Sequence, residues 1–167
     1  FLANKHRIIC LYGEIVNYPR IVDTYGPSYV ADAILALSKV SDEPIWLVID
    51  SPGGNVDDGL SLYDMIKTIS CPVYTVGRSC YSMGAVLLTA GEKGKRFIYS
   101  HSRVMLHLPM GVAAGDSKDM AKQSQEINKI KDVLVDILME NGVMKTKTQI
   151  LKDIDRQYWM SAQEAIE

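Results

Sequence analysis

The apolar run Ile-Trp-Leu-Val-Ile at 45–49 is followed almost at once by Ser51-Pro-Gly-Gly54. A continuously apolar run of this length is typical of a strand covered on both faces, as in parallel sheets. Paired glycines at the carboxyl end of such a strand let the backbone approach a ligand and direct N–H groups at it. A plain Pro-Gly turn would have the same sequence, so the motif does not define a site by itself.

Further short apolar runs alternate with helical patterns along the chain. Strands are predicted at 7–11, 45–49, 72–76, 96–99 and 104–107, and helices at about 28–39, at 57–68, from about 82, and at 117–140. This alternation predicts an α/β fold with a mostly parallel sheet. The longest helix carries an apolar stripe that can face the chain's own core or a neighbouring subunit: Ile127, Ile130, Val133, Leu134, Ile137 and Leu138.

Bulk properties exclude several classes of protein. With 167 residues, 47% hydrophobic and 23% charged, the chain is expected to fold as one globular domain. A net charge of −2 argues against nucleic acid as a partner, and no apolar run approaches the roughly 18–20 residues that span a bilayer. Residues 1–15 lack the pattern of a signal peptide. The histidines and cysteines show no metal-ligand spacing, so no metal and no cofactor are expected.

Ser82 begins an apolar helix directly after a predicted strand, in the stretch Gly77-Arg-Ser-Cys-Tyr-Ser-Met-Gly84. A serine at this position can simply cap the helix. It can also be a nucleophile on a tight turn, where backbone amides stabilise developing negative charge. Cys80 lies two residues earlier and is the alternative nucleophile, but its local context is the weaker one.

His107 ends the last of the predicted strands, in Ser102-Arg-Val-Met-Leu-His-Leu-Pro109. A histidine there is more often structural than catalytic. If the fold brings this strand end to the sheet edge that carries Ser82, the imidazole can act as a general base for the hydroxyl.

The order of these motifs resembles the ClpP family of self-compartmentalised serine peptidases. The matching stretches are SPGG at 51–54, the SMGA turn at 82–85, SRVMLHLP at 102–109 and DRQYWMSAQEA at 155–165. The resemblance covers nearly the whole chain from Arg7. It implies a single domain with a spiral of ββα units, as in the related crotonase fold, and a protruding handle helix. The head would comprise about 1–108 and 143–167, and the handle about 109–142.

The resemblance also implies roles for individual residues. Ser82 would form an acyl-enzyme, His107 would be its base, and the backbone N–H groups of Gly54 and Met83 would form the oxyanion hole. Asp155 and Arg156 would make ring contacts. Burial of the apolar stripe against other subunits becomes the favoured interpretation.

The implied assembly and setting follow from the same family. Subunits would form heptameric rings stacked as a tetradecamer, working on short peptides or unfolded proteins and partnering with an AAA+ unfoldase such as a Clp ATPase. The three cysteines without disulfide spacing fit the cytoplasm or an equivalent reducing compartment such as a plastid stroma.

The sequence departs from the family pattern at the third triad position, where Gln157 stands in place of the usual aspartate. A glutamine carbonyl can orient an imidazole but cannot stabilise its charged form. In another serine protease, loss of the triad carboxylate lowered turnover by about 10⁴. Peptide hydrolysis is therefore expected to be weakened, with Asp155 as a nearby substitute carboxylate. The residues between Val16 and Gly26 also form a longer link than is usual in the family.

Three hypotheses are compatible with the sequence. The chain can be a serine endopeptidase, a low-activity ring subunit that pairs with an active homologue, or a crotonase-like acyl-CoA enzyme. The third does not require Ser82-Met-Gly84 or His107. Ser–Lys signal-peptide peptidase relatives share the glycine pair, but the segment around His107 favours a histidine base.

Overall fold

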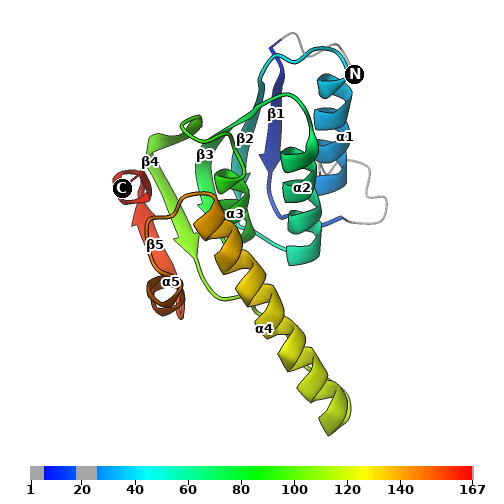
Figure 1. Ribbon diagram of the computed structural model, residues 1–167, viewed down its shortest axis with the longest axis vertical. Helices are drawn as coiled ribbons and strands as arrows, with labels where there is room; N and C mark the ends of the chain where they lie inside the picture. Colours follow the sequence, from blue (N-terminus) through cyan, green and yellow to red (C-terminus); the bar gives the residue numbers. More distant parts are fainter. Residues whose placement is uncertain (1–5, 18–25, 167) are drawn as a thin grey trace. The chain divides into compact units, whose positions relative to one another are not determined.

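The computed structural model describes residues 6–17 and 26–166, which form two compact units (Figure 1). The first unit is Phe1–Met105 with Trp159–Glu167, and the second is Leu106–Tyr158. Most of the link predicted to be longer than in the family, residues 18–25, lies outside the described residues.

The first unit is built on a five-stranded sheet in the order β1-β2-β3-β4-β5. The strands are β1 (Ile8–Tyr12), β2 (Ile45–Ser51), β3 (Val73–Tyr81), β4 (Arg96–Leu106) and β5 (Tyr158–Ser161), the last residue of β4 and the first of β5 belonging to the second unit. β1, β2 and β3 pair in parallel, as do β3 and β4. This confirms the predicted α/β fold with a mostly parallel sheet.

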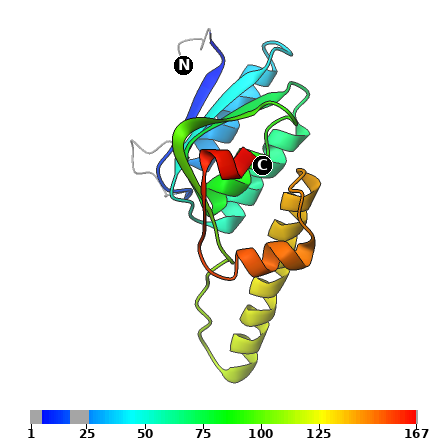
Figure 2. The ribbon, with the colours of Figure 1, turned by 90° about the vertical axis from the view of Figure 1, so that its left-hand side faces the viewer.

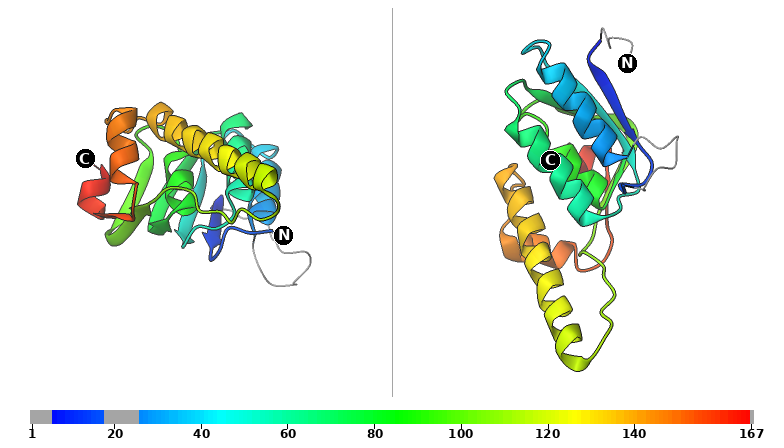
Figure 3. Two further views of the ribbon diagram at one scale, coloured as in Figure 1. Left: turned by 90° about the horizontal axis from the view of Figure 1, so that it is seen from below. Right: turned by 90° about the vertical axis from the view of Figure 1, so that its right-hand side faces the viewer.

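Three helices cover one face of this sheet: α1 (Pro27–Ser38), α2 (Val56–Thr68) and α3 (Met83–Thr89) (Figure 3). The side chains beneath them alternate along the strands, so that Leu11, Leu47 and Ile49 are fully buried. The intervening residues form the other face and are only partly covered. A short helix, α6 (Ala162–Ile166), follows β5.

The prediction of two separate strands at 96–99 and 104–107 was wrong, because residues 96–106 form one strand, β4. β4 pairs with β3 on both sides of a register shift, with Gly77 opposite Ile98 and Ser79 opposite Arg103. The polar residues between these two pairs form an irregularity within the strand, where the Ser102 hydroxyl donates to the Gly77 carbonyl (3.3 Å). β3 likewise extends to Tyr81, five residues beyond its predicted end.

The second unit contains the long helix α4 (Ser117–Glu140) and the short helix α5 (Lys147–Asp153). Val135 and Leu138 of α4 pack with Ile150 and Ile154 in a buried cluster. An extended segment before α4 runs back along it (Figure 2). The Gln123 side chain holds that segment by exchanging two hydrogen bonds with the backbone of Ala114 (2.9 and 3.0 Å).

The apolar stripe of α4 divides into a buried and an exposed part. Leu134, Ile137 and Leu138 are buried, whereas Val133 is exposed. The expectation that other subunits cover the stripe is wrong for Leu138, because this side chain packs against Ile150 of the chain's own α5.

Candidate active site

Ser82 is the single residue between β3 and α3, and its backbone is strained. Its φ of 53° and ψ of −121° lie outside the regions that serine normally adopts, and only Arg7 shares a positive φ among the non-glycine residues of 6–17 and 26–166. Such a conformation costs about 1–3 kcal/mol and is concentrated at functional sites. The Ser82 amide is fixed by a hydrogen bond to the Met105 carbonyl (2.7 Å).

The capping explanation for Ser82 does not fit this geometry. A capping serine has an extended backbone and accepts a hydrogen bond from the first turn with its side chain. Ser82 occupies the N-cap position of α3, but its side chain makes no capping hydrogen bond. The Ser82 side chain therefore does not serve as the cap that begins α3.

The loop Ser51–Asn55, here called the oxyanion loop, lies against this turn. A Cβ atom on Gly53 would lie 2.6 Å from the Ser82 Cβ and 3.1 Å from the Met83 nitrogen. A Cβ atom on Gly84 would lie 3.0 Å from the Ser51 carbonyl oxygen. Position 53 requires glycine, and a side chain at position 84 would need Ser51 to shift by a few tenths of an ångström, because the loop and the Ser82 turn touch through their backbones.

Two backbone N–H groups near Ser82 are available to a ligand. Ile15 forms a parallel bridge with Gly54 by bonding to the carbonyl of Gly53 (2.8 Å) and the amide of Asn55 (2.7 Å). In a parallel bridge the central residue points its own N–H to the opposite side, so the Gly54 amide faces away from Ile15. The Met83 amide belongs to the first turn of α3, which has no preceding helical carbonyl to bind.

The Gly53 amide, in contrast, is occupied. It donates to the Ser51 hydroxyl (3.1 Å), a contact that folds the loop back on itself. Gly54 and Met83 are the two predicted oxyanion donors, and that role stays a prediction.

Cys80 is buried beneath the turn. Its side chain is fully enclosed, its thiol donates to the Ile49 carbonyl (3.6 Å), and burial raises the pKa of the thiol to about 12. A thiol with such a pKa stays protonated near neutral pH and is a poor nucleophile. This argues against the cysteine alternative.

His107 and Gln157 both belong to the second unit. His107 follows the last residue of β4, and the next amide, that of Leu108, donates to the Ile154 carbonyl (3.0 Å). Ile154 begins the turn 154–157, which ends at Gln157 immediately before β5. The hydrogen bond therefore places the segment containing His107 beside the turn that carries Gln157.

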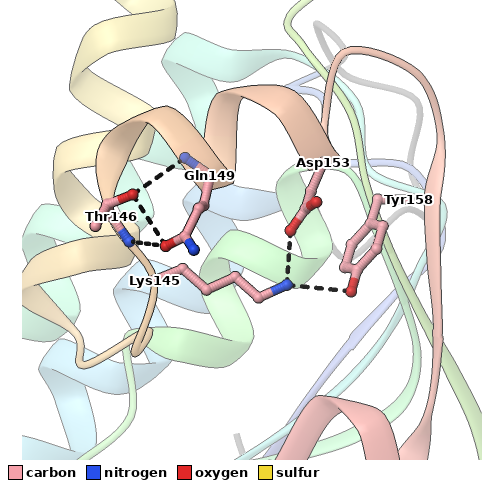
Figure 4. Close-up of polar contacts among 5 residues, drawn as sticks. All are labelled: Lys145, Thr146, Gln149, Asp153 and Tyr158. Atoms are coloured by element: carbon pink, nitrogen blue, oxygen red, sulfur yellow. Dashed lines mark hydrogen bonds and ion pairs between the residues drawn. The ribbon is translucent and has the colours of Figure 1, made fainter.

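Lys145 contacts the residues on both sides of the turn 154–157, as Figure 4 shows. Its ammonium group donates to the Asp153 carboxylate (2.6 Å) and to the Tyr158 hydroxyl (3.2 Å), and these contacts raise the pKa of Lys145. Thr146 and Gln149 beside it form a capping box that begins α5. Sequence reasoning missed Lys145, because a lone lysine in a polar loop carries no signal of its contacts.

Asp155 and Arg156, the predicted ring contacts, are exposed on the same turn. The Arg156 guanidinium bonds to the backbone carbonyl of Asp155 (3.2 Å). Their role in a ring stays a prediction.

The match to a known family covers almost the entire chain. Residues 2–167 match the model of the Clp protease family, and the chain belongs to that family. Membership supports a peptidase, and it suggests ring-shaped oligomers and protein substrates.

Two further properties bear on the class of protein. No helix among the described residues is long and apolar enough to cross a membrane. Within residues 6–17 and 26–166, no group of three or more histidine, cysteine or acidic side chains is placed to hold a metal ion.

Proposed function

We propose that this chain is the serine peptidase subunit of a self-compartmentalised Clp-like protease, with Ser82 as the nucleophile. The observation that carries the proposal is the strained Ser82 turn packed on the glycines of the oxyanion loop. Capping of α3 does not account for a serine in this conformation, whereas a nucleophile held on a tight turn does.

The reaction follows from these parts. The Ser82 oxygen attacks the scissile carbonyl while His107 accepts its proton, and the amides of Gly54 and Met83 stabilise the oxyanion. The tetrahedral intermediate collapses to an acyl-enzyme as His107 protonates the leaving amine, and water then releases the acyl group by the same steps. This chemistry requires His107 to reach hydrogen-bond distance of Ser82.

Gln157 limits the rate in this proposal. Its amide oxygen can accept a hydrogen bond from His107 and hold one tautomer, but it cannot stabilise the imidazolium by charge. The protein is therefore a slow peptidase. The spiral arrangement, the handle and the assembly into stacked heptameric rings with an unfoldase partner are part of the same proposal.

The partly covered face of the sheet supports assembly into rings. Ile8, Tyr12 and Phe97 are 44–47% exposed there, and the Phe97 ring stacks on Trp46 (5.5 Å between centroids). An apolar face of this kind is usually an interaction surface. Neighbouring copies of the chain are the partners that family membership suggests.

Hydrolysis of a fluorogenic peptide by wild type, Ser82→Ala and Gln157→Asp tests the proposal. We expect slow cleavage by wild type, none by Ser82→Ala, and a gain on the order of 10-fold or more in Gln157→Asp because a carboxylate stabilises the imidazolium. Cleavage that survives Ser82→Ala would contradict the proposed nucleophile.

The same assay distinguishes the proposed peptidase from the second candidate function, which is a ring subunit without catalytic activity of its own. Gln157 favours that alternative because it replaces a charged catalytic group. No cleavage by wild type together with no gain in Gln157→Asp would show that the subunit is disabled elsewhere.

A further inference from the structure

The segment Gly13–Asn17, here called the strap, runs along the back of the oxyanion loop. Its first amide, that of Gly13, donates to the Asp50 carbonyl (2.9 Å). Ile15 then binds the residues on both sides of Gly54, as described above. The strap thus contacts the loop on the side opposite to the Gly54 amide.

The fit between strap and loop is too close to allow independent movement. A Cβ atom on Gly54 would lie 2.3 Å from the Ile15 carbonyl oxygen and 2.8 Å from the Ile15 nitrogen. The Ile15 side chain is fully buried, which fixes the strap at its centre. Any shift of the strap is therefore transmitted to Gly54.

Asn17 anchors the far end of the strap. Its backbone and side-chain N–H groups donate to the two carboxylate oxygens of Asp58 (2.9 and 2.7 Å). Its side-chain oxygen accepts from the amide and the hydroxyl of Ser28 at the start of α1 (3.0 and 2.8 Å). Asn17 therefore ties the strap to the first turns of two helices.

Asp58 also contacts the oxyanion loop. Its amide donates to the side-chain oxygen of Asn55 (3.0 Å), the last residue of that loop and the N-cap of α2. The contacts form a closed circuit from the loop through Asp58 and Asn17 to Ile15 and back to Gly54.

We propose that Asn17, paired with Asp58, is a positioning residue that holds the Gly54 amide in place for the oxyanion. This inference rests on the proposed function, because it assigns a purpose to the oxyanion loop of that site. The hydrogen bonds of the pair are exposed, so we expect them to add little to global stability. A small displacement of an oxyanion donor has a much larger effect on the rate of reaction.

Exchanging the two residues gives a sharp test. In Asn17→Asp two carboxylates face each other and one donor is lost. In the swap Asn17→Asp with Asp58→Asn, every contact is rebuilt. The carboxylate now at position 17 accepts hydrogen bonds from Ser28 and from the side-chain amide now at position 58. The side-chain oxygen at position 58 in turn accepts from the backbone amide of residue 17. The matched control is Asn17→Asp with Asp57→Asn, which has the same net charge and an exposed neighbouring position but cannot rebuild the pair.

We expect Asn17→Asp and the matched control to lower kcat about 10-fold with little change in KM. This loss of kcat is smaller than the 10²–10³-fold loss caused by removing an oxyanion donor outright. The swap should return kcat to within about 3-fold of wild type, a recovery that depends on pairing. Thermal unfolding of each variant, compared with wild type, shows that the loss is not unfolding. If Asn17→Asp does not fold, Asn17→Ala takes its place.

The outcomes distinguish this inference from the proposed function. If Ser82→Ala abolishes cleavage but Asn17→Asp and Asn17→Ala retain wild-type kcat, the positioning role is wrong and the peptidase stands. Equal kcat in the swap and in the matched control also overturns the positioning role. If Ser82→Ala cleaves as wild type does, the proposed function itself fails.

Discussion

Ser82 shows how a strained residue is held by its neighbours. A positive φ is unfavourable for serine, and the chain sustains it because the backbones of the oxyanion loop and the Met105 carbonyl leave no room to relax. Gly53, the residue that lies against the Ser82 Cβ, has no side chain of its own. At this scale the site is defined by close backbone contact rather than by charge.

Cys80 gives a prediction at the same scale. Because burial raises the pKa of its thiol to about 12, and because the thiolate is the form that reacts, alkylation of Cys80 by iodoacetamide should be negligible at pH 8 in the folded protein. Cys10, which is half-exposed, should react first. Peptide mapping by mass spectrometry measures both sites, and faster modification of Cys80 than of Cys10 would contradict the burial described here.

The helix α5 shows how a short element is fixed at both ends. The Thr146 and Gln149 capping box satisfies its first turn, and Ile150 and Ile154 anchor it in the buried cluster. A seven-residue helix has little intrinsic stability, so these contacts determine whether it forms.

Removing the cap should therefore be measurable. Thr146→Ala should lower the free energy of unfolding by about 1 kcal/mol, because it leaves an amide of the first turn without its acceptor. Urea denaturation measures the change. Thr148→Ala, an exposed threonine within the same helix, is the control and should change stability by less than about 0.5 kcal/mol. Equal effects of the two variants would show that the capping box adds nothing.

Sequence patterns predicted the elements well where the periodicity is long and regular. The buried strand from Ile45 and the 24-residue helix α4 were confirmed. The pattern failed at β4, where polar residues occupy an irregular part of the strand, and at β5, whose four residues are too few to show a period. The strap was missed because its pairing with Gly54 joins residues that are far apart in sequence and carry no shared motif.

At the scale of the whole molecule, the partly covered face of the sheet is the feature that a single chain does not explain. Trp46, Tyr74 and Phe97 form an aromatic cluster there, with centroids 5.1 and 5.5 Å apart, and such residues are enriched in protein interfaces. Ring assembly would remove this apolar surface from water.

Phe97→Lys tests this interpretation. A charge on the face should shift the mass measured by native mass spectrometry or light scattering toward smaller species, because burying an unpaired charge is costly. Phe97→Leu keeps the surface apolar and should assemble as wild type does. Val40→Lys introduces the same charge at a highly exposed apolar residue outside the sheet and should have no effect. Unchanged assembly of Phe97→Lys would exclude this face as a subunit contact.

The central claim is that Ser82 is an activated nucleophile, and covalent labelling tests it most directly. The assembled protein is treated with a fluorophosphonate, and the modified residue is located by tandem mass spectrometry, with Ser82→Ala as the control. The structure predicts a single adduct on Ser82 that is absent from the variant. No adduct on Ser82, or an adduct on another residue that persists in Ser82→Ala, would contradict the account.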